Sequence, residues 1–471
     1  MDRAPARHGA GTAMISCLPM ARWLDADRPG GDLVAWAGDH VWTRERLRRD
    51  VAALAQRLKN MPGDRWAIRL EDGYGFTAAL LGLLHAGKTP VIPGHDRPAL
   101  LREMIGQGAF TGLLGRDKLD VDAPQLVLDP LTPFCPAGAM NAELPALAED
   151  RAVELFTSGS TGRPRRVVKP VACLDWEASA LAGEFSTILA GSRIIASVSP
   201  QHLYGLTFRI VLPLALGLPL HADMIFYPEQ LAALDCSVPH AFIASPAFLK
   251  RLGSPLARPG VSMLLSAGGA LSAAEADRAE DWFGVAVHEI YGSTETGVLA
   301  WRHRVTEDPP WRPFPVVRLL ADGDGWRALS PLIPELKGVA LDDVLDVTPQ
   351  GCFRLLGRRD RIVKIEEKRV SLDEVERRLR ALDGVCDAAA VLIERGRRRH
   401  IGALLVLTDA MRHDWRSGGG ARQKQDWRRA LSAWLDPVAV PRYWRETERI
   451  PENAMGKRIA ERMREMFDDV A

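Results

Sequence analysis

The chain carries the stretch Leu155-Phe156-Thr157-Ser158-Gly159-Ser160-Thr161-Gly162-Arg163-Pro164-Arg165-Arg166 directly after a short apolar run. Glycines let a backbone turn sharply and approach a ligand closely. Hydroxyls and N–H groups in such a turn form a donor-lined hollow that suits phosphate oxygens. The stretch therefore predicts a phosphate-binding loop, with a polar surface loop as the alternative. It contains neither the G-x-G-x-x-G dinucleotide fingerprint nor the G-K-[ST] sequence of a Walker loop.

Length and composition predict a soluble globular protein of at least two domains. The chain has 471 residues, of which 47% are hydrophobic and 26% charged. A chain of this length exceeds one ordinary core. The net charge of +1 gives no overall field that would recruit nucleic acid or an anionic membrane. No apolar run is long enough to span a bilayer, so we expect no membrane insertion.

The cysteines and the N-terminus favour a cytoplasmic location. The six cysteines are scattered and form no C-x-x-C pair, so we expect neither a disulfide framework nor a cysteine zinc site. The apolar patch at residues 13–21 is interrupted by Pro19 and lacks a clean cleavage signature. We interpret it as a flexible start rather than a signal peptide.

The first third of the chain alternates between strand and helix patterns. A hairpin is expected around Gly38-Asp39, followed by a helix over residues 44–58 that Thr43 could cap. Residues 66–70 and 90–93 are predicted strands, and residues 76–86 form a predicted buried helix. This alternation predicts parallel sheets covered by helices.

Three further predicted strands end in chemically distinctive turns. The strand at 193–198 leads to Pro200-Gln201-His202-Leu203-Tyr204-Gly205, and the strand at 261–265 leads to Gly268-Gly269. The strand at 287–290 leads to Tyr291-Gly292-Ser293-Thr294-Glu295. Ligands of open α/β sheets bind at the carboxyl ends of strands, although a histidine packed beside an aromatic ring is the simpler alternative for His202.

At this point the chain resembles the adenylate-forming superfamily, which includes acyl- and aryl-CoA synthetases, firefly luciferase and the adenylation domains of peptide synthetases. The resemblance runs from about Trp42 to near the C-terminus. Residues 157–162 resemble the family's phosphate loop and residues 291–295 its Tyr-Gly-x-Thr-Glu motif. Residues 200–205 are similar to the motif that carries an aromatic residue or histidine near the acyl pocket.

The C-terminal third adds three matches. Residues 357–364 resemble the family's hinge motif, in which Arg358 would reach the ATP ribose and Asp360 would be the pivot between domains. Asp343 lies 358 − 343 = 15 residues before Arg358, the family's usual separation, and would take the role of the ribose-binding Asp, although the family's Thr-Gly before it is absent. Residues 451–457 resemble the terminal Gly-Lys motif and make Lys457 the expected catalytic lysine, whereas alone they would indicate a solvated turn.

The resemblance implies an α/β fold with two parts. Residues 1–359 would form a large N-terminal adenylation domain of two packed αβ sheets and a small β-barrel-like part around residues 311–356. Residues 360–471 would form a small mobile α+β lid that carries Lys457. Within the lid we expect a helix at 373–382, strands at 388–393 and 401–407, a polar insertion at Ser417-Gly418-Gly419-Gly420 and a helix with Trp427, Leu431 and Trp434.

The implied reaction is ATP-dependent activation of a carboxylic acid as an acyl-adenylate, followed by transfer to a thiol. Charge neutralisation and positioning dominate such a reaction, and the acid is already an anion, so no general base is needed. Lys457 would bridge the acid and the α-phosphate, and Glu295 would hold Mg²⁺. Thr157, Ser158, Ser160, Thr161 and Thr294, with Gly159, Gly162 and Ser293, would surround the phosphates. Tyr291 and Gly292 would lie at the adenine beside Gly268 and Gly269.

Several departures affect the thiol acceptor. The family's Pro-Lys-Gly is Pro164-Arg165-Arg166 here, and Glu366-Glu367 stands where many relatives have a glycine at the pantetheine entrance. Coenzyme A and the phosphopantetheine of an acyl carrier protein therefore both stay open as acceptors. The cluster Arg395, Arg397, Arg398 and Arg399 could contact an acidic carrier protein, with a solvated basic turn as the alternative.

The acid is predicted from the pocket residues that the resemblance implies. An α-amino acid would need a carboxylate partner for its ammonium, and this chain has His202 where peptide synthetases carry Asp. The remaining pocket is apolar with a few hydroxyls, which favours an aryl acid, such as a hydroxybenzoate or cinnamate, or a short or medium unsaturated acid. The chain most resembles the compact ligases of aryl-polyene-type clusters; a non-catalytic nucleotide-binding relative is the alternative from another class. The pocket residues are His202, Leu203, Tyr204, Ser245, Ser266, Ala267, Gly292 and 297–300 with Gly297.

Overall fold

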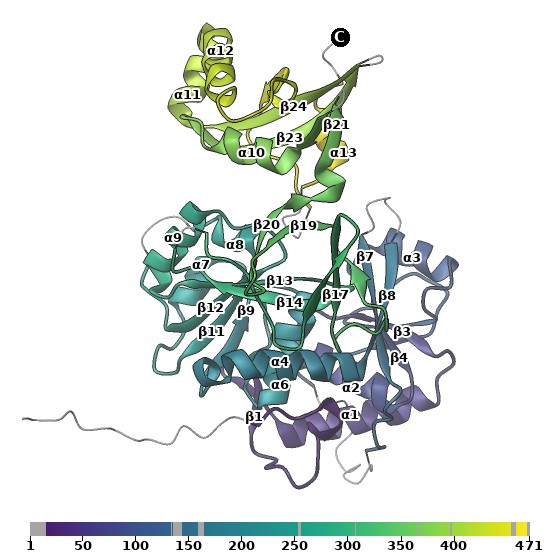
Figure 1. Ribbon diagram of the computed structural model, residues 1–471. Helices are drawn as coiled ribbons and strands as arrows, with labels where there is room; N and C mark the ends of the chain where they lie inside the picture. Colours follow the sequence, from purple (N-terminus) through teal and green to yellow (C-terminus); the bar gives the residue numbers. More distant parts are fainter. Residues whose placement is uncertain are drawn as a thin grey trace, which may run out of the picture. The chain divides into compact units, whose positions relative to one another are not determined.

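The fold is a computed structural model that describes residues 16–132, 134, 144–158, 164–252, 256–306, 308–365, 368–395, 398–453 and 458–468. These residues group into two compact units (Figure 1). The first unit runs to Arg318 and also takes in Leu329–Val339. The second unit consists of Leu319–Ala328 and the chain from Ala340 onward. The predicted domain boundary at residue 360 stays a prediction.

The larger sheet of the first unit has nine strands. Its inner strands run parallel, and the hairpin partners at its two edges run antiparallel. The central strand β11 (His240–Ala244) is buried along its whole length, as expected of a parallel sheet covered on both faces. The order is β15 (Arg312–Pro313), β14 (Gly297–His303), β13 (Val287–Ser293), β12 (Val261–Ala267), β11, β9 (Arg193–Ala196), β10 (Leu220–His221), β1 (Leu33–Ala37) and β2 (His40–Thr43).

The second sheet of this unit has six strands. All neighbours are parallel except β7 and β8, which form the antiparallel hairpin around the predicted phosphate loop. The order is β6 (Gln125–Val127), β5 (Gly112–Gly115), β3 (Arg65–Arg69), β4 (Thr89–Ile92), β7 (Ala152–Ser158) and β8 (Pro164–Pro170). The two sheets are the αβ sheets that the sequence predicts.

Helices cover these sheets, and four of the described helices of this unit, α1, α2, α8 and α9, begin at a residue whose side chain caps the helix. The Thr43 side chain accepts a hydrogen bond from Arg46 N, which confirms the predicted cap of α1 (Arg44–Lys59). Helix α2 (Gly73–His85) is buried on all sides, as the all-round apolar segment predicts. The other helices are α3 (Pro98–Gly106), α4 (Val171–Leu189), α5 (Leu203–Gly205), the π-helix η2 (Leu206–Val211), α6 (Leu212–Leu216), α7 (Pro228–Ala232), α8 (Pro246–Leu249), α9 (Ala273–Phe283) and the 3-10 turn η1 (Met20–Arg22).

The second unit contains several small sheets. A three-stranded sheet stands where the β-barrel-like part was predicted, and an antiparallel pair follows it. The unit's main sheet pairs β23 with β24 antiparallel and β24 with β25 parallel. The strands are β16 (Arg318–Asp322), β17 (Gly325–Leu329), β18 (Val339–Ala340), β19 (Asp343–Val347), β20 (Phe353–Arg358), β21 (Ile362–Ile365), β22 (Lys368–Ser371), β23 (Val385–Arg395), β24 (Arg398–Leu407) and β25 (Tyr443–Glu446).

The polar stretch predicted as an insertion at residues 417–420 lies at a kink between two helices. The turn η4 (Trp415–Gly419) continues α11 (Asp409–Asp414), and α12 (Gly420–Leu431) follows the kink. Gly418 has a φ of 108°, so the backbone leaves the helical conformation there and a kink separates the two helices. Trp427 and Leu431 are buried as expected, whereas Trp434 lies beyond the helix and is 67% exposed. The remaining helices are α10 (Leu372–Arg380), α13 (Ala460–Glu465) and the 3-10 turns η3 (Arg359–Arg361) and η5 (Pro437–Ala439).

None of the helices in the described ranges is both long and apolar enough to cross a membrane.

Candidate active site

The described ends of the β7–β8 hairpin frame the predicted phosphate loop. Thr157 pairs with Arg165 across the two strands, and its hydroxyl donates to the Arg165 carbonyl at 3.4 Å. The backbone of Ser158 ends β7. Gly159, Ser160, Thr161 and Gly162 lie outside the described residues.

The two arginines after this loop have different partners. Arg166 donates to the buried carboxylate of Glu154 at 2.5 Å, and Arg65 binds the same carboxylate from β3. Arg165 is 71% exposed at its side chain, and its Nη1 lies 3.9 Å from Glu295 Oε1. Of the pair that replaces the family's Lys-Gly, Arg165 therefore faces the predicted metal ligand, and Arg166 is taken up by a structural ion pair.

Glu295 lies in the tight connection between β13 and β14. Ser293 and Thr296 brace this turn, because Ser293 N donates to Thr296 Oγ1 at 3.0 Å and Thr296 N donates to Ser293 Oγ at 3.2 Å. A Cβ on Gly292 would stand 2.2 Å from the Gly297 carbonyl oxygen, so only glycine fits there. The Glu295 side chain is 27% exposed.

A single accessible carboxylate of this kind fits a magnesium ion that also binds phosphates. Mg²⁺ held by nucleotide phosphates commonly takes one or two protein carboxylates. Among the described residues no group of three or more His, Cys, Asp or Glu side chains forms a metal cage. The donor set of Glu295 and Thr294 therefore suits a metal that arrives with its phosphates.

Two buried charged residues that the motifs did not identify hold this turn. Lys169, at the end of β8, donates from Nζ to the Glu295 carbonyl at 3.0 Å and to the Leu332 carbonyl at 3.0 Å. Glu177, on α4, accepts from Val298 N at 2.8 Å and from the Thr207 hydroxyl at 3.1 Å. The only sequence signal for either was a charged residue within an apolar segment.

Hydrogen bonds connect the predicted acyl-pocket segment to both sheets. Gln201 Nε2 donates to the carbonyls of Ile68 and Leu70, at the end of β3, at 2.9 and 3.0 Å. His202 lies beside Gly94, whose Cβ would stand 3.7 Å from His202 Cε1 and 2.8 Å from the Phe156 carbonyl oxygen. Gly94 has a φ of 78°, so this close approach requires glycine. His202 therefore lies close to β7, the strand that carries Thr157.

Tyr204 connects this segment to the nine-stranded sheet. Its hydroxyl lies 2.9 Å from the Ala244 carbonyl oxygen and 3.2 Å from that of Leu265, at the ends of β11 and β12. Burial raises the pKa of Tyr204 well above its usual value, so the phenol stays neutral. Leu203 is buried next to it in α5.

The remaining predicted pocket and adenine residues lie at the same strand ends. Ser245 caps α8 by accepting from Phe248 N at 3.2 Å, and the buried Ser266 hydroxyl has no partner within the described chain. Ala267 ends β12 before Gly268, which has a φ of 87° and open space at its Cβ position. Ala267 pairs with Ile290 in parallel register, so Gly268 and Gly269 follow beside Tyr291. The Tyr291 ring lies 5.7 Å from that of Trp311.

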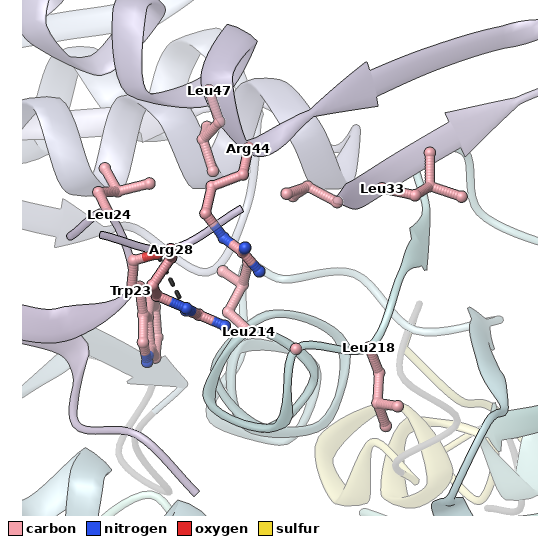
Figure 2. Close-up of a pocket in the computed structure, with 10 residues that line it drawn as sticks. Trp23, Leu24, Arg28, Leu33, Arg44, Leu47, Leu214 and Leu218 are labelled. Atoms are coloured by element: carbon pink, nitrogen blue, oxygen red, sulfur yellow. Dashed lines mark hydrogen bonds between the residues drawn. The ribbon is translucent and has the colours of Figure 1, made fainter. Parts of the chain in front are cut away.

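Two cavities in the described part of the first unit lie away from these residues. One cavity has a volume of about 10 Å³. Figure 2 shows its lining, which consists mainly of leucines with Trp23, Arg28 and Arg44. Such a volume holds about one water molecule, so it is no substrate pocket. A larger hollow of about 170 Å³ lies at β14 and β15 and is lined by Trp301, His303 and Arg312, among others.

In the second unit, the predicted ribose-binding pair lies on one hairpin. Asp343 and Arg358 are directly opposite each other in the β19–β20 register. Arg358 N donates to Asp373 Oδ2 at 3.1 Å, and its guanidinium lies 3.6 Å from Asp342. The backbone of Asp360 lies in the 3-10 turn η3, and its side chain is not described.

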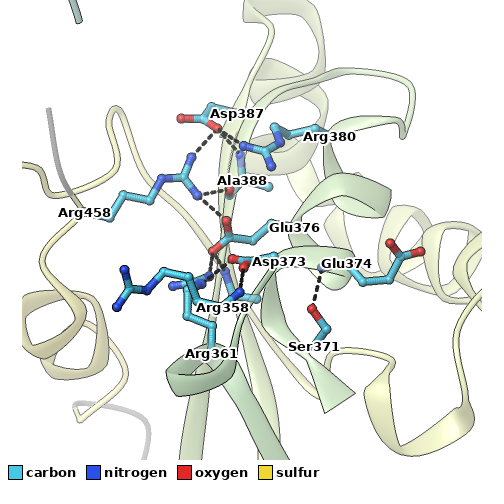
Figure 3. Close-up of polar contacts among 11 residues, drawn as sticks. Arg358, Arg361, Ser371, Asp373, Glu374, Glu376, Arg380, Asp387, Ala388 and Arg458 are labelled. Atoms are coloured by element: carbon cyan, nitrogen blue, oxygen red, sulfur yellow. Dashed lines mark hydrogen bonds and ion pairs between the residues drawn. The ribbon is translucent and has the colours of Figure 1, made fainter. Parts of the chain in front are cut away.

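A buried carboxylate, that of Glu376, joins several segments of this unit (Figure 3). Glu376, on α10, binds Arg361 through Oε1 and accepts from Arg458 Nη1 at 2.8 Å through Oε2. Arg458 also donates to Asp387 at 2.7 Å. Lys457, the predicted catalytic lysine, lies outside the described residues, and Arg458 directly follows it in the chain.

Two of the arginines predicted to contact a carrier protein bind other residues of this unit. Arg395 donates to the Phe467 carbonyl at 2.6 Å, and Arg399 pairs with Glu394 at 2.8 Å. Arg398 is exposed, and Arg397 lies outside the described residues.

Comparison with known proteins identifies the family. The family model described as AMP-binding enzyme matches residues 23–324, more than half of the chain. The chain belongs to this family of AMP-binding enzymes. This membership confirms the predicted adenylate-forming superfamily and the predicted enzyme class of AMP-forming acid–thiol ligase.

Individual relatives agree with this assignment. The chain is 30% identical over 311 residues to a 4-coumarate–CoA ligase of Halorhodospira halophila, covering 64% of this chain and 73% of the relative. It is 26% identical over 419 residues to the malformin synthetase mlfA of Aspergillus homomorphus, covering 76% of this chain but only 8% of that protein. The ATP-bound MatB of Rhodopseudomonas palustris, 20% identical, has a TM-score of 0.80 over 96% of this chain and 99% of its own. This last likeness confirms the predicted α/β fold with a small C-terminal part.

Proposed function

We propose that the protein activates a carboxylic acid with ATP, releases pyrophosphate and transfers the acyl group from the adenylate to a thiol. The observation that carries this proposal is the approach of Glu295 to Arg165, 3.9 Å apart, beside the strand that leaves the predicted phosphate loop. A carboxylate and a cationic side chain at one loop suit a magnesium-bound triphosphate.

The chemistry asks mainly for positioning and charge compensation. The acid carboxylate attacks the α-phosphorus, the bond to the β-phosphate breaks, and pyrophosphate leaves with the electron pair. Mg²⁺ on Glu295, when bound, would neutralise the phosphates. Thr157, Ser158, Ser160, Thr161, Thr294 and the backbone N–H groups at Gly159 and Gly162 would donate to phosphate oxygens. Lys457 would supply a compact positive charge between the acid and the α-phosphate.

The motifs of the family suggest which residues would bind the nucleoside. Tyr291 would stack on adenine beside Gly268, Gly269, Gly292 and Ser293. Asp343 would accept from the ribose hydroxyls, and Arg358 would reach the same sugar. Asp360 would act as the hinge pivot, with the domain boundary there.

For the acid, we propose an aryl acid such as a hydroxybenzoate or cinnamate. The segment His202, Leu203 and Tyr204 would supply one wall of the acid pocket, and Ser245, Ser266, Ala267 and Gly297 lie at the neighbouring strand ends. The relative named 4-coumarate–CoA ligase supports an aromatic acid and coenzyme A as the acceptor. We place the protein among the compact ligases of aryl-polyene-type clusters as a finer proposal.

A carrier-protein acceptor is the second candidate. The observation that favours it is Glu366-Glu367 at the position where a glycine is expected for the pantetheine entrance. Thioester formation with coenzyme A and with a holo acyl carrier protein separates the two acceptors. Equal or faster turnover with coenzyme A alone would eliminate the carrier-specific candidate.

The reaction itself is tested by acid-dependent pyrophosphate release over a panel of aryl and fatty acids. We expect release with aryl acids and a loss of roughly 100-fold or more in Lys457→Ala, since an electrostatic contact in the transition state is removed. Lys59→Ala, at an exposed lysine in α1, is the control and should match the wild type. Equal release by the wild type and Lys457→Ala would instead favour a nucleotide-binding relative without catalysis.

A further inference from the structure

The turn that carries Glu295 is held from two sides by buried charges. From one side, the Lys169 ammonium, whose residue is 1% exposed, donates to the Glu295 carbonyl and to the Leu332 carbonyl. From the other side, the Glu177 carboxylate, 2% exposed, accepts from Val298 N. The Glu295 carbonyl and the Val298 N–H therefore each form a hydrogen bond with a charged side chain.

The same two residues connect this turn to the other candidate motifs. Lys169 belongs to β8, the strand that returns from the predicted phosphate loop. The second oxygen of Glu177 accepts from Thr207, in the π-helix that follows the His202 segment. A Cβ on Gly297 would lie 3.0 Å from Glu177 Oε1, so the absence of a side chain there lets the carboxylate reach the turn.

Burying an ammonium and a carboxylate is costly unless their hydrogen bonds are satisfied and the charges compensate each other. Burial lowers the pKa of Lys169, and the Glu177 charge opposes that shift. Burial raises the pKa of Glu177, and the Lys169 charge opposes it. Core packing alone could be served by apolar side chains, so a charged pair at this place indicates a need for fixed geometry.

We propose that Lys169 and Glu177 are positioning residues that fix the backbone of the Glu295 turn for binding of magnesium-bound ATP. This inference rests on the proposed function. The side chains do not touch the nucleotide; they set the place of the Glu295 carboxylate relative to the phosphate loop. Small displacements of such a group weaken binding and turnover strongly.

The experiment measures Mg·ATP affinity by calorimetry on the full-length chain, together with the KM for Mg·ATP and kcat. We expect Lys169→Met to weaken Mg·ATP binding about tenfold, with Lys169→Arg restoring part of it because it keeps a donor. Lys88→Met is the matched control. Lys88 is also a buried lysine, 7% exposed, and donates to two carbonyls, of Met61 and Gly63, away from this turn.

Thermal unfolding separates positioning from stability. Both lysine variants should lower the unfolding temperature, but only Lys169→Met should change Mg·ATP affinity. Unchanged affinity in a folded Lys169→Met, or an equal loss in Lys88→Met, would overturn the inference. If Lys169→Met does not fold, Thr207→Val takes its place in the test. We expect this variant to bind Mg·ATP more weakly, and unchanged binding would contradict the inference.

These outcomes are distinct from failure of the proposed function. Calorimetry needs no acid substrate, so a wild type that binds no Mg·ATP would refute the proposed function itself. A wild type that binds Mg·ATP as tightly as Lys169→Met would refute only the positioning role. In the double variant Lys169→Met/Glu177→Gln, an effect smaller than the product of the single effects would support action as a pair, and a full product would contradict it.

Discussion

At Glu295 the main chain and the side chain have separate partners. The carbonyl is held by Lys169, whereas the carboxylate is part-exposed and only 3.9 Å from the exposed Arg165. An ion pair between groups this accessible contributes little to stability. The carboxylate is therefore available to a cation.

The first prediction concerns this carboxylate. Glu295→Gln keeps the shape of the side chain and removes its charge, so we expect kcat/KM for ATP to fall roughly 100-fold. The unfolding temperature should stay near that of the wild type. Pyrophosphate release over a magnesium titration measures the effect, with Glu280→Gln on the exposed face of α9 as the control. Wild-type kinetics in Glu295→Gln would contradict the assignment.

His288 supports a prediction on pH. Burial, together with the stacked His303 ring 4.1 Å away, lowers the pKa of His288 to about 4. The unfolded chain takes up this proton near pH 6.5, so stability is complete above that pH and falls as the pH drops toward 4. The loss at pH 5 should be about 2 kcal/mol. Denaturant unfolding at pH 7 and pH 5 checks it, and His288→Phe should lose less stability over this range.

At the scale of elements, helix α4 anchors the beginning of the described chain. Asp175 accepts from Met20 N at 2.8 Å, and burial raises the pKa of Asp175 to about 6. Stability from this group is complete below pH 3.8 and is lost as the pH rises through 6. Asp175→Asn keeps an acceptor for Met20 N and removes the charge.

We therefore expect Asp175→Asn to unfold at a higher temperature than the wild type at pH 7.5. Near pH 4 the two should unfold at nearly the same temperature. Melting curves over pH 4–8 test this expectation. A variant less stable than the wild type at pH 7.5 would show that the ionised carboxylate stabilises the N-terminal segment.

The turn into the π-helix η2 gives a backbone prediction. A Cβ on Gly205 would stand 1.9 Å from the Ser199 carbonyl oxygen, so Gly205→Ala should destabilise the first unit by roughly 1–3 kcal/mol. Gly183, within α4, has no neighbour within 4 Å of its Cβ position. Gly183→Ala should instead be neutral or stabilise by about 0.5–1 kcal/mol. Thermal unfolding of both variants tests the difference, and equal effects would contradict it.

The elements also explain what the sequence could predict. Strands with turn residues at their ends and the capped helix α1 follow from local patterns, so the strand ends of the predicted site were recognisable. The engagement of Arg166 by Glu154 and the role of Lys169 depend on distant strands and turns, which local patterns do not report. The three glycines at 418–420 signal a break in the chain, and the structure has a kink between two helices at Gly418.

At the scale of the whole molecule, the second unit is assembled from two separate segments. Leu341 N donates to the Trp326 carbonyl at 2.8 Å, and Trp326 Nε1 donates to the Leu345 carbonyl at 3.2 Å. Arg359 lies 3.4 Å from Asp324. Residues 319–328 therefore form hydrogen bonds and an ion pair with the rest of this unit.

This arrangement predicts the behaviour of fragments. Residues 340–471 alone lose the partners on β16 and β17 and should be less stable than residues 319–471 by about 1–3 kcal/mol. Urea unfolding followed by circular dichroism compares the two fragments. Equal midpoints would mean that the β16–β17 hairpin contributes nothing to the unit.

Recombination between this chain and its relatives is constrained for the same reason. The backbone passes from one unit to the other three times, near residues 318, 329 and 339. A single crossover placed after residue 340 would import a foreign terminal segment while keeping the resident β16–β17 hairpin, and so would mix two parental sequences inside one unit. Libraries that exchange both segments together should yield more folded progeny than those that exchange the terminal segment alone.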